Sequence, residues 1–426
     1  MRENKKIGFV EAFSIGVGGM VGGGIFAVLG LTIELSHGAA PLAFAIAGMI
    51  ALVTAYSYVK LSLRYPSEGG TIEFIVRAFG NGYFASFVNS LMLISYVIML
   101  ALYAYAFGSY GSALLVGTDT EWIHKSLSVG IIVLFVFINL LGAFMTGKAE
   151  DIMVFVKLLI LLVFSSVGFF SIEWTHLAPQ EWMPLPSVVT GGLMIFLAYE
   201  GFELIANTAK DIKNPQKNLP LAYYSSVIFV IVLYVVIAMV AVGNVTLEQA
   251  ENSQDYILAI AAEPFFGHGG FLLIGIAALL STASAINATI YGAGRTAYLI
   301  AKFGEIPQSF EKKVKHGFEG MIIIGLLGII FAISFNLTNI SVAGSLGFLL
   351  IFTLVNLANF RMYQETKASR VIAGFGVFLS LSAVIVLLGY NALHAPSSLL
   401  TSGIVIGVVA LFSVAYHKYR LHKKGV

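Results

Sequence analysis

The sequence has few charged residues and no cysteine. Of its 426 residues, 11% are charged and 58% are hydrophobic, and the mean hydropathy is +0.90. Soluble domains have about 25% charged residues, so a chain of this composition must lie mostly in lipid. The absence of cysteine excludes disulfides, iron–sulfur clusters and thiolate metal sites. The net charge of +2 excludes a polybasic nucleic-acid-binding protein.

Histidine is also scarce inside the apolar segments. The eight histidines lie at or near the ends of apolar runs, which argues against a haem or zinc site within the membrane. The apolar runs also contain no nucleophile and base at a spacing suited to catalysis. We therefore expect no cofactor, no metal site and no enzymatic activity.

Long apolar runs make up most of the chain, and they are continuous rather than alternating. A membrane-spanning helix needs roughly 20 such residues, and continuous runs favour helices over a β-barrel. The sequence therefore predicts an all-α membrane protein with twelve transmembrane helices. The predicted spans are 8–32, 39–63, 85–114, 126–146, 150–172, 187–208, 220–243, 270–300, 320–336, 339–360, 371–391 and 398–417.

The basic residues are divided unequally between the two sets of loops. With the N-terminus inside, 22 of the 24 Lys and Arg residues lie on the cytoplasmic side, beginning with Arg2, Lys5 and Lys6. The opposite loops are acidic and contain only Lys125. By the positive-inside rule, we expect a cell-membrane protein with both termini in the cytoplasm. The basic segment 417–424 is then a cytoplasmic membrane-surface anchor.

Three ionisable residues remain inside predicted spans: Lys157, Glu200 and Glu203. A charge at the centre of a membrane helix costs at least ~2.5–3.5 kcal/mol, so each is a candidate functional residue. Lys157 could instead extend its amine toward the cytoplasmic surface. The two glutamates could instead be protonated and hydrogen-bonded across a helix pair.

Two spans contain sequences that disfavour a continuous helix. The first has six glycines between positions 16 and 24, and Gly22, Gly23 and Gly24 each cost ~1 kcal/mol of helix stability. Small residues can also serve close helix packing, but three consecutive glycines in mid-span are more than packing requires. The sixth span has Gly201 between two acids. Interruptions five spans apart indicate an inverted-repeat transporter, with repeats 1–172 and 173–360 and a remainder 361–426.

Interrupted helices present backbone groups in mid-membrane. Free N–H groups at a helix start suit a carboxylate, and free carbonyls suit an ammonium or a small cation. Because a zwitterion needs both, the pattern points to an α-amino acid as substrate.

Five motifs, in this order, resemble those of the amino acid–polyamine–organocation (APC) family of transporters over nearly all of the first ten spans. They are the segments 16–26, 64–70, 198–203, 211–220 and 284–295, the last continuing to Gly304-Glu-Ile-Pro307. The resemblance implies the LeuT-type fold, a 5+5 inverted repeat with discontinuous helices 1 and 6.

The resemblance also implies substrate contacts, all of them with the main chain. The groups expected to bind the carboxylate are the N–H groups of Gly22, Gly23 and Gly24. The groups expected to bind the ammonium are the carbonyls of Met20, Leu197 and Glu200.

The fifth span, with Lys157 in Asp151-Ile-Met-Val-Phe-Val-Lys-Leu-Leu-Ile160, is similar to that of the proton-coupled, sodium-independent members related to ApcT. There a lysine replaces a coupling sodium. Its ammonium would reach the carbonyls of Gly18 and Val21, near the hydroxyls of Ser281 and Ser284. Glu203 is a further candidate for protonation or for stabilising the unwound helix.

These observations predict a secondary active transporter that imports α-amino acids by proton symport, with H⁺, the substrate and the bilayer as its partners. A sodium symporter and an amino-acid exchanger remain open alternatives. So does a different class, the proton-translocating subunit of a membrane redox complex, although such subunits usually have charged residues in more helices than the two found here.

Overall fold

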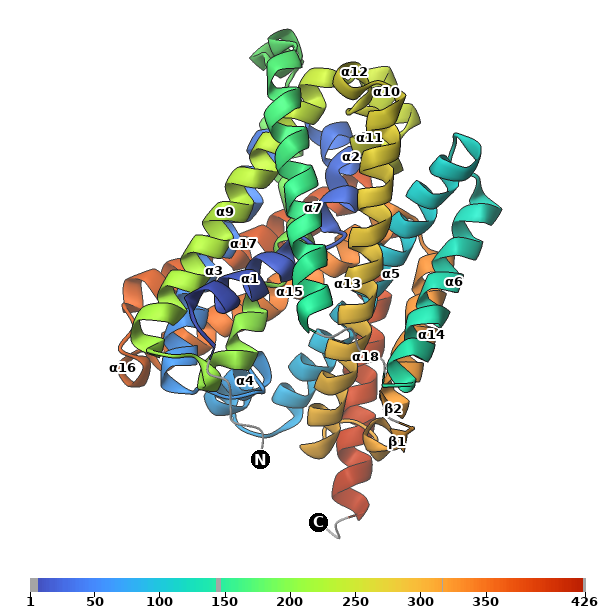
Figure 1. Cartoon of the computed structure of the whole chain (residues 1–426). Helices are drawn as coiled ribbons and strands as arrows, with labels where there is room; N and C mark the ends of the chain where they lie inside the picture. The colour runs from blue at the N-terminus through green and yellow to red at the C-terminus, as the bar shows by residue number, and fades with distance from the viewer. Residues whose placement is uncertain (1–6, 143–146, 316, 424–426) are drawn as a thin grey trace.

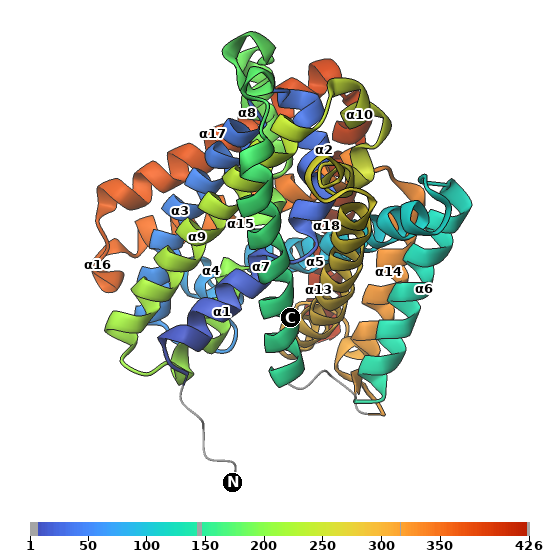
Figure 2. The same cartoon turned by 45° about the horizontal axis from the view of Figure 1, so that its top comes forward.

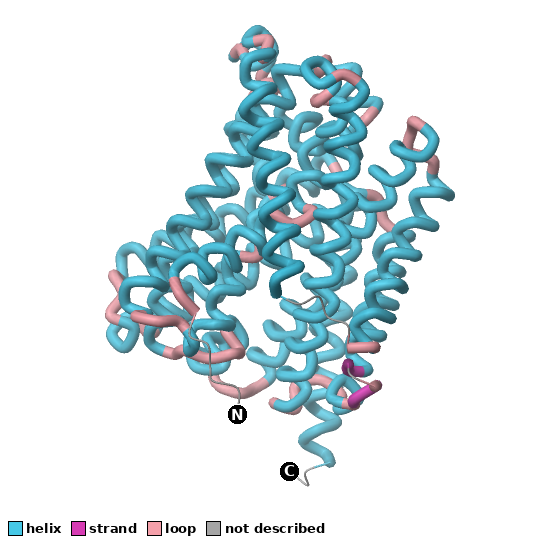
Figure 3. Tube along the Cα trace, in the orientation of Figure 1, coloured by secondary structure: helices cyan, strands magenta, loops and turns pink. Residues whose placement is uncertain are grey.

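The computed structural model describes residues 7–142, 147–315 and 317–423, and these residues are almost entirely helical (Figures 1 and 3). Among them, nine helices are long and apolar enough to cross a membrane. They are α3 (Ala40–Arg64), α5 (Tyr83–Val116), α6 (Glu121–Leu140), α7 (Gly147–Gly168), α9 (Pro215–Asn244), α13 (His268–Lys302), α15 (Leu337–Arg361), α17 (Arg370–His394) and α18 (Pro396–Lys423). The chain is therefore an integral membrane protein.

Two further apolar segments are bent, the first at the predicted interruption and the second at Ile195, shortly before the interruption predicted at 197–203. The first consists of α1 (Phe9–Met20) and α2 (Gly24–Ser36), which meet at 48°. The second consists of α8 (Leu185–Met194) and the 3₁₀ segments η4 (Phe196–Tyr199) and η5 (Phe202–Asp211), with a bend of 50°. Counting each bent pair as one span gives up to 11 spans.

The ninth predicted span corresponds to α14 (Glu319–Ser334), an apolar helix of only 16 residues. It is shorter than the roughly 20 residues that cross a bilayer core without local thinning. The count of twelve spans therefore stays a prediction, as does the division into repeats 1–172 and 173–360 and a remainder 361–426.

Burial differs strongly among the long helices. Within the most apolar 18-residue stretch of each helix, 78% of the residues of α5 and 83% of those of α15 are buried, whereas the share is 28% for α6, α7 and α18. Helices of the second kind expose large apolar side chains such as Phe137, Phe155 and Leu411. In a bilayer these side chains contact lipid, so α5 and α15 form the interior and α6, α7 and α18 the periphery.

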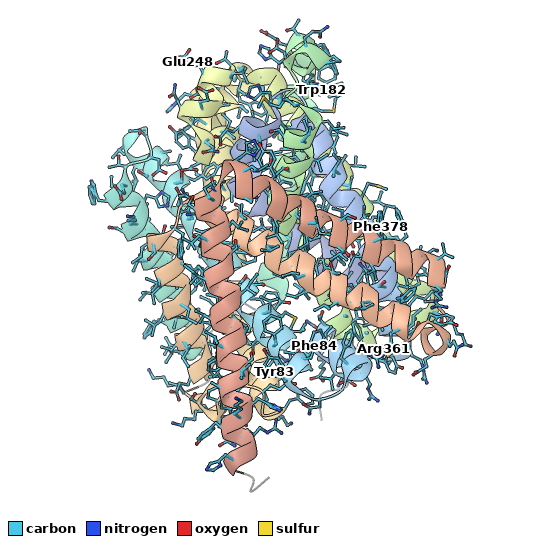
Figure 4. The ribbon with its side chains drawn as sticks, turned by 180° about the vertical axis from the view of Figure 1, so that it is seen from behind. Tyr83, Phe84, Trp182, Glu248, Arg361 and Phe378 are labelled. Atoms are coloured by element: carbon cyan, nitrogen blue, oxygen red, sulfur yellow. The ribbon has the colours of Figure 1, made fainter. Side chains whose placement is uncertain are left out.

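The two ends of the helical body differ in charge. Lys and Arg residues gather where α3, α4 (Thr71–Phe79), α13 and α15 end, and we call this the basic end. The other end, which we call the acidic end, has acids such as Asp119, Glu248 and Asp255 but few Lys or Arg residues. Figure 4 shows Glu248 and Trp182 at the acidic end, far from Arg361, while Phe378 projects from the side of α17. Of the predicted basic residues, Arg2, Lys5, Lys6 and Lys424 lie outside the described residues.

Short elements that the sequence did not predict cover both ends. At the acidic end these are η1 (Phe169–Ser171), η2 (Trp174–Leu177), η3 (Pro179–Glu181), α10 (Leu247–Asn252), η6 (Gln254–Tyr256), α11 (Ile257–Ile260) and α12 (Glu263–Phe266). Figures 1 and 2 both place α10 near α2, and Figure 1 shows this end of the molecule away from the chain termini. At the basic end, besides α4, they are η7 (Gln308–Glu311), the antiparallel pair β1 (Lys313–Val314) and β2 (Gly317–Phe318), and α16 (Tyr363–Thr366).

Candidate functional site

The first interruption is a tightly packed, non-helical segment at Val21–Gly23. A Cβ atom on Gly23 would lie 2.6 Å from Tyr103 Cδ1 and 2.8 Å from Thr282 Cγ2, and one on Gly24 would lie 3.1 Å from Ala198 Cα. These distances are shorter than ordinary contacts, so only glycine fits at position 23 without a shift of its neighbours. Close approach, as well as unwinding, accounts for the glycines here.

The second interruption lies against the first. Gly201 has a φ of 118°, a conformation that L side chains rarely adopt. A Cβ atom on Gly201 would lie 2.3 Å from the carbonyl carbon of Gly19. The two unwound segments, about 180 residues apart by their numbering, therefore meet backbone to backbone inside the helical body.

The amides of Gly22, Gly23 and Gly24, predicted to bind a carboxylate, are free of backbone partners. Among the described residues, none of them donates a hydrogen bond to a main-chain carbonyl outside the helices. Gly24 is also the first residue of α2, where the geometry of a helix leaves the N–H without an intrahelical acceptor. Free N–H groups at the start of a helix form an anion-binding site.

Two of the three carbonyls predicted to bind an ammonium already accept hydrogen bonds within the chain. The Tyr234 hydroxyl donates to Met20 O at 2.7 Å, and the Glu200 N–H donates to Leu197 O at 3.1 Å. Tyr234 also donates to Ala198 O at 3.3 Å, so it connects both unwound segments. A carbonyl oxygen has two lone pairs, so each can accept one more donor.

Ser345 on α15 supports the second interruption from the other side. Its hydroxyl accepts the Leu197 N–H at 3.1 Å and donates to Met194 O at 2.7 Å. These bonds satisfy backbone groups that the end of α8 would otherwise leave unpaired. Sequence reasoning missed Ser345 and Tyr234, and their only sequence signal is a polar group in an otherwise apolar helix.

Lys157 lies in α7 with a relative exposure of 4%. Its ammonium donates to Gly18 O at 3.5 Å, so the amine is directed into the protein rather than along the lipid-facing surface. Of the other predicted coupling residues, Val21 and Ser284 are buried, and the Ser281 hydroxyl donates to Gly22 O at 2.7 Å. The structure thus brings Lys157 to Gly18 and Ser281 to Gly22, both at the first interruption.

Glu200 and Glu203 are buried beside the second interruption. Glu203 accepts the Gly201 N–H at 2.7 Å and the Tyr96 hydroxyl at 3.4 Å. Glu203 therefore holds the unwound backbone through Gly201, whereas the Glu200 side chain lines a cavity.

This cavity, of about 750 Å³, extends from the unwound segments toward the basic end. Its walls include Gly19, Tyr103 and Glu200 in the interior and the exposed residues Val10 and Glu11 at the start of α1. A smaller hollow of about 190 Å³ shares Tyr96, Asn207, Gly292 and Thr296 with it. The site is therefore accessible from the basic end.

Charged residues border the smaller hollow at the basic end. Arg295 Nη2 lies 3.0 Å from Glu68 Oε2, and Lys210 forms an ion pair with the same carboxylate. The hydrogen bond from Lys210 lowers the pKa of Glu68. This network joins the loop after α3 to η5 and α13, the elements that border the hollow.

Comparisons of the sequence with known proteins identify the family. A family model described as amino acid permease matches residues 7–411. The chain is 36% identical to the uncharacterized protein MJ0609 of Methanocaldococcus jannaschii, over 98% of this chain and 96% of the relative. It is 32% identical to the inner membrane transport protein YbaT of Escherichia coli, over 90% and 89%. It is 21% identical to the branched-chain amino acid permease BcaP of Bacillus subtilis, over 83% and 80%. The chain thus belongs to the amino acid permease family within the APC transporters, and it is a transporter rather than an enzyme.

Proposed function

We propose that this permease imports α-amino acids by proton symport. The observation that supports the substrate class best is the set of amides at Gly22–Gly24 that donate to no main-chain carbonyl outside the helices of the described residues. A cavity of about 750 Å³ reaches the same two interruptions at Gly19 and Glu200, although the three glycines are not among its lining residues. The amides would bind the α-carboxylate. The remaining lone pairs on Met20 O and Leu197 O, with Glu200 O, would bind the α-ammonium. These groups are common to all α-amino acids, so the substrate side chain would be selected by the cavity walls.

In this proposal Lys157 is the coupling group. A buried lysine favours the neutral form, whereas neighbouring carbonyl dipoles favour the charged form, so its proton can be gained and lost during a cycle. When protonated, Lys157 would connect α7 to the first interruption through Gly18 O, as a bound sodium ion would. When deprotonated, it would release that connection and favour opening toward the basic end. Glu203, and less directly Glu200, would support the unwound helix or exchange protons in the same cycle.

The same proposal places the basic end in the cytoplasm of the cell and both termini with it. Its support is the division of the 24 Lys and Arg residues between the two sets of loops. The cavity would then be open to the cytoplasm, as expected for a transporter that has released its substrate inside.

Transport into proteoliposomes tests the coupling. Under an inward proton gradient, wild-type protein and the exposed-lysine control Lys302→Ala should accumulate labelled amino acid. Lys157→Ala should lose gradient-driven uptake and retain substrate binding, which a thermal-shift screen over the amino acids detects. Retention of pH-dependent accumulation by Lys157→Ala would contradict the role of this lysine.

The same assay separates the alternatives. Uptake that requires sodium at constant pH would indicate a sodium symporter, and uptake that requires amino acid inside the vesicle would indicate an exchanger. Absence of uptake by the purified chain for every amino acid would overturn the proposed function itself.

A further inference from the structure

The acidic end is closed by a segment that we call the acidic-end cap, residues 247–266, which contains α10, η6, α11 and α12. It packs directly on α2. A Cβ atom on Gly30 would lie 2.0 Å from the carbonyl oxygen of Gln254, so the η6 backbone touches the α2 backbone. The Gln254 side chain also donates to Glu34 at the end of α2. Access to the unwound segments from the acidic end therefore requires this cap to move.

A network of polar side chains connects the cap to α5 and α6. On α5, the Tyr105 hydroxyl donates to Asp255 Oδ2 of η6 at 3.2 Å. The Asp255 carboxyl also lies near that of Asp119, in the turn between α5 and α6, and the two groups interact electrostatically. On α6, His124 Nδ1 lies 2.9 Å from Asp119 Oδ2, and the Tyr105 ring packs edge-on against the His124 ring at 4.2 Å. Of this network, only Asp255 belongs to the cap.

Other charged groups near the network are already paired. Glu121 and Lys125 on α6 form an ion pair of 2.7 Å with each other, and both are substantially exposed to solvent. Glu34 on α2 is bound to Gln254. The groups that face Asp255 from the neighbouring elements are therefore Tyr105, Asp119 and His124.

A direct hydrogen bond between the Asp119 and Asp255 carboxyl groups would require a proton. Two ionised carboxylates are acceptors only and repel each other, whereas one protonated carboxyl can donate to the other. Partial burial, and next the Asp119 charge, raise the pKa of Asp255 to about 6. His124 and the Tyr105 hydroxyl act in the opposite direction.

We propose that Asp119 and Asp255 form a proton-operated latch that holds the acidic-end cap closed over α2 and α5. With a proton between the two carboxyl groups, the cap is fixed to the α5–α6 turn. Without it, the two carboxylates repel each other and the cap loosens. The closed cap is therefore favoured at low pH, and this contribution is lost as the pH rises through the raised pKa of Asp255.

The latch extends the proposed function, because in that orientation the acidic end faces the outside of the cell. The external pH would then set how readily the transporter opens outward. Acid outside the cell would keep the empty transporter closed to the outside.

Cysteine labelling tests the latch without any transport assay. The chain contains no cysteine, so a single introduced cysteine is its only thiol. Ala259 and Ile257 of α11 are fully buried, whereas Asn252 at the end of α10 is exposed. Ala259→Cys and Ile257→Cys report cap opening, and Asn252→Cys corrects for the effect of pH on thiol reactivity. A membrane-impermeant maleimide is added to proteoliposomes at a series of pH values.

The corrected labelling rate of Ala259→Cys should be about tenfold lower at pH 5 than at pH 7.5, with most of the change complete by about pH 6.5. Asp255→Asn, which cannot ionise, should make this reporter label slowly at every pH. The matched control Glu251→Gln, an exposed acid of the same cap, should behave as wild type. A flat corrected profile at both reporters, or an unchanged profile in Asp255→Asn, would overturn the latch.

This outcome is independent of the proposed function. If cap labelling depends on pH but the protein takes up no amino acid, the latch stands and the proposed symport is wrong. If the protein carries out proton symport but cap labelling does not depend on pH, the symport stands and the latch is wrong. Addition of the maleimide to one side of the membrane at a time also shows which end faces outward.

Discussion

The two ends of this permease are held together by different electrostatics. At the acidic end, Asp255 and Asp119 are partly enclosed and interact electrostatically, and each has a polar partner on α5 or α6. At the basic end, Glu68, Lys210 and Arg295 form an ion-pair network whose side chains are 44–52% exposed. Partly enclosed carboxyl groups respond to protons, whereas exposed ion pairs are weak and are screened by salt.

The difference shows how the two ends can be controlled separately. The acidic end is closed by backbone contact between η6 and α2 together with a proton-dependent contact. The basic end has a cavity and a charged border that water reaches. A change of pH should therefore alter access at the acidic end more than at the basic end. A change of ionic strength should alter access at the basic end more than at the acidic end.

The largest expected effect comes from comparing two glycines, one at each end. Gly30→Ala would place a Cβ atom 2.0 Å from the backbone oxygen of Gln254. The α2 backbone fixes the position of this Cβ atom and neither atom can rotate away, so the cap cannot stay closed. Labelling of the Ala259→Cys reporter should rise at least about tenfold at all pH values, since the cap is displaced whether or not Asp255 is protonated. Thermal melting in detergent should also occur at a lower temperature.

Gly292→Ala on α13 is the matched control. A Cβ atom at Gly292 meets nothing within 4 Å, and alanine stabilises a helix by up to ~1 kcal/mol relative to glycine. Its melting temperature should be equal or higher, and labelling at position 259 should not change. Equal effects of the two substitutions would show that the close contact between η6 and α2 has no role in closure.

Glu305 tests the contrast between the two ends, because it is a buried carboxyl group that lies at the basic end. It lies in the loop after α13, is 2% exposed, and accepts a hydrogen bond of 2.7 Å from Asn89 of α5. Glu305→Ala would leave the buried Asn89 donor unpaired, at a cost of about 1–3 kcal/mol in the free energy of unfolding. A lower melting temperature should result, with Glu251→Gln as the control.

The pH dependence of Glu305 should affect stability rather than access. Burial raises its pKa, so the protonated form is favoured in the folded protein. Its contribution to stability is therefore present at low pH and lost as the pH rises through the raised pKa. Glu305→Gln should remove this dependence from the melting temperature. If it also changed labelling in the cavity, the basic end would contain a proton-dependent closure of its own.

The long apolar runs predicted the membrane-spanning helices of this fold, and the glycine clusters predicted where two of the spans are interrupted. The bends at Val21–Gly23 and near Gly201 follow from local helix propensity, which can be read at each residue. Membership of the APC family, predicted from five motifs, is confirmed by the family match over residues 7–411. The position of Lys157 against Gly18 O agrees with the prediction, whereas its role in coupling stays a prediction.

The contacts that sequence reasoning missed are nonlocal. Tyr234 and Ser345 bind the unwound segments from α9 and α15, and no spacing within those helices marks them. The acidic-end cap consists of short helices whose apolar residues are too few to show a period. Its contact with Gly30 depends on two backbones meeting across more than 200 residues of sequence, and a helical glycine gives no sign of its partner.

The smallest expected effect concerns ionic strength at the basic end. Thr296→Cys on α13, which lines both hollows, reports access there. Raising salt from about 0.05 M to about 0.5 M should weaken the pairs of Glu68 with Lys210 and Arg295 and increase labelling at most about fivefold, since exposed pairs contribute up to ~1 kcal/mol. In Glu68→Gln, position 296 should label at the high-salt rate at both salt concentrations. The hydrogen bond from Lys210 lowers the pKa of Glu68 and favours its ionised form, so pH should change this labelling rate less than salt does. A salt effect at position 259 as large as that at position 296 would show that the two ends are not controlled separately.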